Sequence, residues 1–88
     1  MEKKPPRERK SHPPEIVIQL GERLKKIIEN KKLKQREVAN DAGMDVENLR
    51  KYIKGTQEMK ISTVFRIAEA LGITAVELLD GIKIKKED

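Results

Sequence analysis

Apolar residues recur every three or four positions in the segment from about residue 15 to residue 31. The recurring positions are Val17, Leu20, Leu24, Ile27 and Ile28. This spacing is typical of a helix that buries one face, and it does not match the alternation of a half-buried strand. The pattern therefore predicts a long first helix, which Lys31 and Lys32 close because cations are favourable at a helix C-terminus.

The rest of the chain has the pattern of four shorter helices separated by glycines. They are expected over about residues 35–42, 46–54, 61–71 and 75–80, and they end near Gly43, Gly55, Gly72 and Gly81. Glycine is favoured just after a helix because it adopts the left-handed conformation without steric cost. Thr74 and Glu77 have the spacing of a capping box at the start of the last helix. No segment of useful length alternates like a strand, so the predicted fold class is all-α.

One face of the fourth predicted helix is apolar along its whole length. It carries Ile61, Val64, Phe65, Ala68 and Leu71 at helical spacing. The pattern predicts an amphipathic helix with a single apolar face.

The second and third predicted helices are joined by a tight turn at Gly43, with Asp45 expected as the N-cap of the third. Successive helix residues lie about 100° apart around the axis, so Leu49 marks the buried face of residues 46–54. Val46, Tyr52 and Ile53 lie near that face, and the outward stripe carries Glu47, Arg50, Lys51 and Lys54. Long charged side chains of this kind reach base edges and phosphates in a major groove. The pair of helices therefore predicts a helix-turn-helix DNA reader.

The ordered set of motifs resembles the lambda-repressor/Cro family, also called the Xre family. The matching elements are Leu24, LKQREVANDAG at 33–43, LRKYIKG at 49–55 and IAEALGITAVELL at 67–79. The resemblance implies a compact five-helix lambda-repressor-like DNA-binding domain whose third helix, about 46–54, reads the major groove. It also implies a sequence-specific transcriptional regulator of the repressor type.

The resemblance places DNA contacts at the start of the second helix and along the third. Gln35 matches a phosphate anchor, Lys54 matches another phosphate contact, and the positions of Val46, Glu47 and Lys51 match those that meet base edges. The predicted DNA-binding set is Gln35, Arg36, Val46, Glu47, Asn48, Arg50, Lys51, Tyr52 and Lys54. Lys34 and Lys60 depart from the family, which prefers a small capping residue at both positions.

Two of these side chains have alternative roles that the sequence leaves open. Glu47 could accept a hydrogen bond from a cytosine amino group, or it could pair with Lys51, four residues on. Tyr52 could donate its hydroxyl to a phosphate, or it could cover the edge of the core.

The charge distribution indicates an acidic partner, and we expect double-stranded DNA. The formal net charge is +5, and residues 25–37 carry six basic side chains against two acidic ones. Residues 1–14 hold every proline and a net charge of +3, which predicts a disordered basic arm. The arm either follows the minor groove or adds non-specific affinity. The expected organisation is this arm, a helix-turn-helix domain at 15–82 and a charged tail at 83–88.

Nothing in the sequence indicates an enzyme, and we expect no cofactor or metal. The chain has no cysteine, and His12 is its single histidine, so a transition-metal site is not expected. Ser11 and Ser62 have no plausible base to activate them. The sequence shows neither a signal peptide nor a membrane span, so we expect a cytoplasmic protein with no membrane partner.

The sequence also predicts a homodimer, because one short recognition helix reads too few base pairs for useful specificity. The candidates for its interface are Val76, Leu79, Ile82 and Ile84, which could instead cap the core. Small members of the family serve as phage-type repressors or as antitoxins that regulate their own operon, so a toxin protein is a further candidate partner. The alternative function is a protein-interaction adaptor that keeps the fold without specific DNA binding.

Overall fold

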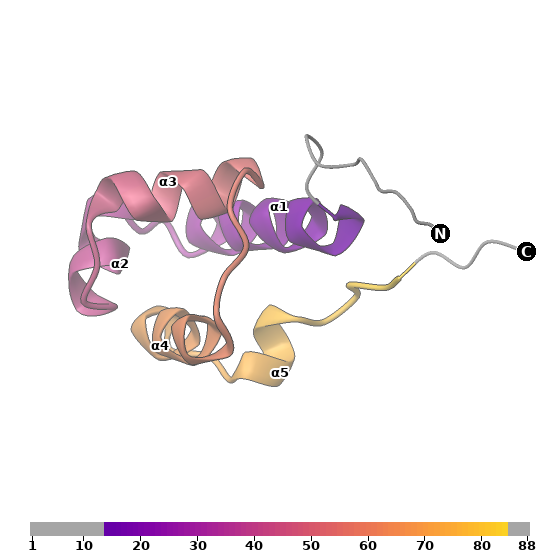
Figure 1. Cartoon of the computed structure of the whole chain (residues 1–88). Helices are drawn as coiled ribbons and strands as arrows, with labels where there is room; N and C mark the ends of the chain where they lie inside the picture. Colours follow the sequence, from indigo (N-terminus) through magenta and orange to yellow (C-terminus); the bar gives the residue numbers. More distant parts are fainter. Residues whose placement is uncertain (1–13, 85–88) are drawn as a thin grey trace, which may run out of the picture.

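A computed structural model of the chain describes residues 14–84. Its helices are α1 (Glu15–Asn30), α2 (Gln35–Asp41), α3 (Val46–Lys54), α4 (Ile61–Leu71) and α5 (Ala75–Leu78). No strand occurs within this range, and the predicted five-helix, all-α class is confirmed (Figure 1). The helix α5 is shorter than the predicted 75–80, because Leu79 already has non-helical backbone angles. The predicted basic arm lies outside the described residues apart from Pro14.

Each helix contributes one large, fully buried apolar side chain to a single core. In chain order these are Leu24, Val38, Leu49, Ile67 and Leu78. Figure 1 shows α3 alongside α1, with α4 and α5 on the other side of the core. Isolated helices as short as α2 and α5 are marginal in water, so this shared burial is what holds them in helical form.

The helix ends confirm most of the predicted stop signals. Gly43, Gly55, Gly72 and Gly81 all have positive φ angles, between 74° and 83°. The same conformation follows α1 at Lys32, with φ 59°. There the amide groups of Lys32 and Leu33 still donate to the carbonyls of Glu29 and Ile28, both at 3.0 Å.

The helix starts confirm one predicted cap and correct another. The Thr74 hydroxyl accepts from the Glu77 amide at 3.0 Å, and the Glu77 carboxylate accepts from the Thr74 amide at 2.9 Å, which completes the predicted capping box. Asp45 occupies the N-cap position of α3, but its side chain makes no capping hydrogen bond. Lys34 and Lys60 likewise occupy N-cap positions without a side-chain bond.

Ile61 and Phe65 lie on the predicted apolar face of α4 but outside the core. Their exposed fractions are 71% and 58%, whereas Val64, Ala68 and Leu71 of the same helix are buried. The buried residues of α4 form a narrow stripe that the neighbouring helices cover, and Ile61 and Phe65 lie beside that stripe. The apolar face of α4 is therefore wider than the part that this domain buries.

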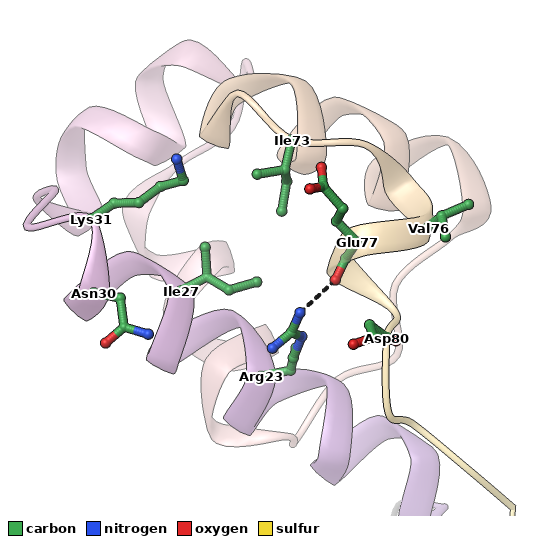
Figure 2. Close-up of a pocket in the computed structure, with 8 residues that line it drawn as sticks. All are labelled: Arg23, Ile27, Asn30, Lys31, Ile73, Val76, Glu77 and Asp80. Atoms are coloured by element: carbon green, nitrogen blue, oxygen red, sulfur yellow. Dashed lines mark hydrogen bonds between the residues drawn. The ribbon is translucent and has the colours of Figure 1, made fainter.

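Two sets of hydrogen bonds fasten the C-terminal part of the described chain to α1. The Gln19 side chain donates to the Lys83 carbonyl at 2.9 Å and accepts from the Lys83 amide at 3.0 Å. The Arg23 guanidinium donates to the backbone carbonyl of Glu77 at 2.7 Å (Figure 2). The chain after α4 is therefore anchored to α1 at two points, one in α5 and one beyond it.

The middle of α1 and the last turn of α3 approach each other closely. A Cβ atom added at Gly21 would lie 2.5 Å from the carbonyl oxygens of both Tyr52 and Ile53. Those oxygens belong to the backbone of α3, so they cannot move away without shifting that helix. Gly21 therefore sets how deeply α3 sits against α1.

We expect Gly21→Ala to lower the free energy of unfolding by about 1–3 kcal/mol, since the added methyl overpacks the contact. This range is the net loss, after the gain of about 1 kcal/mol in helix propensity that alanine brings. Urea unfolding followed by circular dichroism would measure it. Glu22→Ala, at the exposed neighbouring position, is the matched control, and equal stability of the two variants would contradict the assigned role of Gly21.

Candidate nucleic-acid interface

The turn between α2 and α3 is short and stabilised by backbone hydrogen bonds. After α2, the Gly43 amide donates to the Asn40 carbonyl at 3.1 Å, and the Met44 amide donates to the Ala39 carbonyl at 2.9 Å. Gly43 has φ 74°, a backbone conformation that residues other than glycine rarely adopt. Val38 and Ala39 on α2 and Ala42 directly after it are buried. These features place α2 and α3 in a helix-turn-helix arrangement.

The helix α3 has a buried face and an exposed face that agree with the predicted stripe. Leu49 has an exposed fraction of 0%, and Val46, Tyr52 and Ile53 are half-buried against the core. The exposed residues are Glu47, Asn48, Arg50, Lys51 and Lys54. Every exposed side chain of α3 can therefore make or accept hydrogen bonds, and three of the five are cations.

The end of α3 is held by the residues that follow it. Gly55 has φ 75°, and both the amide and the hydroxyl of Thr56 donate to the Lys51 carbonyl, at 3.0 and 3.2 Å. A Cβ at Gly55 would come within 3.0 Å of the Ile18 Cα atom. The last turn of α3 is thus packed against α1 at both Gly21 and Gly55.

Glu47 is paired with Arg50 rather than with Lys51. An Arg50 Nη1 atom donates to Glu47 Oε2 at 3.3 Å, one helical turn away. The exposed fractions of the two side chains are 75% for Glu47 and 47% for Arg50. The pair lies in the first half of α3, and solvent reaches both partners.

Arg50 also borders a shallow depression at the N-terminal end of α2. Its lining residues are Lys34, Gln35, Arg36, Glu37 and Arg50, and its volume is about 540 Å³. Three of these side chains are basic and one is acidic, so the depression carries a net positive charge. The structure thus brings the predicted residues Gln35 and Arg36 together with Arg50 of α3.

The remaining predicted residues lie on α3 outside this depression. Val46 and Tyr52 pack against the core, although both keep part of their surface exposed. Asn48, Lys51 and Lys54 are exposed on α3 and do not line the depression. The DNA contacts assigned to all nine residues remain predictions.

Sequence reasoning missed two residues that shape this surface. Lys34 was noted only as an unusual cap, yet it lines the depression with Arg50. Gly21 sets the position of α3 from another helix. A glycine in the middle of a helix costs stability, and that cost is the signal that could have drawn attention to it.

Other kinds of site are not formed by the described residues. Between residues 14 and 84, no three His, Cys, Asp or Glu side chains come close enough to hold a metal ion. Across the same range, no helix has the length and apolar character needed to cross a membrane.

A family model for the helix-turn-helix domain matches residues 21–84, which is most of the chain. The chain belongs to the helix-turn-helix domain family. This assignment confirms the resemblance to the lambda-repressor/Cro family, and it identifies the chain as a DNA-binding domain of the type used in transcription regulation.

Solved structures of other helix-turn-helix proteins share this fold. The restriction-modification controller protein C.AhdI from Aeromonas hydrophila is 26% identical, with a TM-score of 0.68 over 70% of this chain and 94% of that one. The transcription factor NHTF from Neisseria, described as hypothetical, is 25% identical, with a TM-score of 0.69 over 74% and 75%. The clp gene regulator ClgR from Corynebacterium glutamicum is 23% identical, with a TM-score of 0.72 over 75% and 86%, and supports the fold alone. No curated protein sequence matches the chain.

Proposed function

We propose that this helix-turn-helix domain is a sequence-specific transcriptional regulator that binds double-stranded DNA as a homodimer and represses by occupying its operator. The exposed polar face of α3 is the observation that carries the proposal. The helix α3 has nine residues, and an α-helix with its side chains is about 10–12 Å in diameter, which fits a major groove about 12 Å wide.

The exposed residues divide into base readers and phosphate contacts in this proposal. Glu47 and Lys51 lie nearest the centre of the outward face, opposite Leu49, so they would point most directly at base edges. Lys54 lies in the last turn of α3, and Gln35 and Arg36 lie at the start of α2. Such flanking positions suit phosphates, which fix register and orientation without carrying sequence information.

A duplex pool of random sequence, selected at near-physiological salt, should yield an inverted repeat with half-sites about one helical turn apart. Lys51→Gln should then relax preference at particular positions of the half-site, by about 1–3 kcal/mol. Lys54→Gln should weaken all sequences alike and reduce the salt dependence of binding by about one counterion. Fluorescence anisotropy on matched duplexes would measure both effects.

Lys25→Gln removes the same charge from an exposed position of α1 and is the control for this experiment. It should leave sequence preference unchanged. Recovery of no motif, with binding that disappears as salt rises, would contradict sequence-specific regulation and leave only non-specific affinity.

The homodimer is supported by apolar side chains exposed on α5 and after it. Val76 and Ile84 have exposed fractions of 80% and 75%, and Leu79 of 38%. Val76 is one of the residues that line the open pocket drawn in Figure 2. Val76 and Ile84 therefore do not cap the core, which was the alternative role for them. Leu79 and Ile82 line a groove together with residues of α1, so these two also contact the rest of their own domain.

We expect Val76→Glu to shift the chain from dimer to monomer, because a carboxylate buried in an apolar interface has no partner. Size-exclusion chromatography with light scattering would measure the mass. Val76 is almost fully exposed, so the variant should retain the circular dichroism spectrum and melting temperature of the original chain.

Ile61→Glu is the matched control, since it places the same charge at an exposed apolar residue of α4. A monomer from Ile61→Glu, together with a dimer from Val76→Glu, would place the interface on α4 and contradict our assignment.

The adaptor alternative requires an α3 face suited to a protein partner. An apolar or acidic face would favour it, whereas the observed face holds Arg50, Lys51 and Lys54. Failure to bind any duplex at low salt would favour the adaptor, because Lys and Arg side chains on a groove-sized helix bind DNA electrostatically even without sequence preference.

A further inference from the structure

The ion pair between Glu47 and Arg50 places an acceptor and a donor side by side on the face of α3 that meets DNA. The two groups are 3.3 Å apart and both are exposed. We propose that they act as one unit that reads a G·C base pair, with Arg50 donating to guanine and Glu47 accepting from cytosine. This inference rests on the proposed function and names the sequence feature that the recognition helix selects.

Helix geometry gives the pair its position. At about 100° per residue, Glu47 lies near the centre of the outward face, whereas Arg50 lies toward its edge, on the side of the depression at α2. The bond to Glu47 turns the Arg50 guanidinium toward the N-terminal half of α3. The N-terminal residues of a recognition helix are those that contact base edges.

The hydrogen-bonding pattern of the pair matches G·C better than A·T. In the major groove, a G·C pair presents two adjacent acceptors, guanine N7 and O6, followed by the cytosine amino donor. An arginine fork donates to two adjacent acceptors, and a carboxylate beside it accepts from the donor. An A·T pair has its donor between two acceptors, so the fork would face a donor and leave the arrangement mismatched.

Electrostatics gives a second reason for the pairing. An unpaired carboxylate at the centre of this face would be repelled by the phosphates that border the groove. Arg50 neutralises Glu47, and Glu47 in turn engages the guanidinium of Arg50, which lines the depression with Lys34 and Arg36. Without Glu47, Arg50 would be free to bind a phosphate there, and phosphate contacts carry no sequence information.

The test uses the operator recovered from the random pool and a set of duplexes in which each G·C pair of a half-site is replaced by A·T. We expect the original chain to discriminate at one G·C pair in each half-site by roughly tenfold to a hundredfold. Arg50→Lys keeps the charge but loses the fork, and it should lose most of that discrimination. Replacing the guanine with 7-deazaguanine, which lacks N7, should weaken the original chain and leave Arg50→Lys almost unaffected.

Glu47→Ala should lose discrimination at the same base pair while binding unrelated DNA more tightly, since a negative charge has been removed from the interface. Combining Glu47→Ala with Arg50→Lys should cost no more discrimination than the larger single effect, because residues that act as one unit are not additive. Melting temperatures should stay unchanged, as both side chains are exposed, and Lys54→Gln should preserve the discrimination.

Three outcomes would overturn the inference. Equal weakening of all sequences by Arg50→Lys would make Arg50 a phosphate contact. Additive losses at two different base pairs would mean that Glu47 and Arg50 act separately. An operator without a G·C pair sensitive to both residues would also contradict the inference while leaving the proposed function intact, whereas recovery of no motif by the original chain would contradict both.

Discussion

The position of the recognition helix depends on the close approach of α1 to the last turn of α3 at Gly21. Because that residue has no side chain, the carbonyl oxygens of Tyr52 and Ile53 lie where a Cβ would otherwise be. Leu49, one turn earlier, is fully buried. A helix of nine residues has little stability of its own, so these two contacts define both its existence and its height above the core. The geometry of the proposed DNA-binding surface is therefore determined by a helix that contributes none of the predicted contacts.

The same arrangement places the structural role of α3 on its buried face and the proposed recognition role on its exposed face. Its buried stripe is apolar and packs against the core, and its exposed residues make no contact on which the fold depends. Substitutions on the exposed face can thus change what the helix recognises at small cost in stability, since exposed sites away from caps and cores are usually within about 0.5 kcal/mol of neutral. The ion pair between Glu47 and Arg50 is local, and it leaves the packing of α3 untouched.

Much of the fold could be predicted from the sequence because its signals are local. Helical periodicity and glycines at helix ends located the helices, and the spacing of Thr74 and Glu77 identified a cap that the structure confirms. The exposure of Phe65 could not be predicted, because periodicity gives the direction of an apolar stripe but not the width that neighbouring helices cover. Charge spacing alone could not choose between the third and the fourth residue after Glu47 as its partner. The meeting of Lys34 with Arg50 depends on the turn between two helices, so no local pattern reveals it.

The attachment of the C-terminal segment to α1 has a consequence for the spacing of the two half-sites. Gln19 holds Lys83, and Arg23 holds α5 through Glu77, while the same helix α1 seats α3 through Gly21. In the proposed dimer, the interface and the DNA-reading surface of each subunit are thus both attached to the same helix, α1. The distance and the orientation between the two DNA-reading surfaces of such a dimer are therefore fixed. Each base pair inserted between the half-sites rotates one of them by about 34° around the duplex axis. The two recognition helices of a dimer with fixed geometry could not both reach half-sites that are rotated in this way.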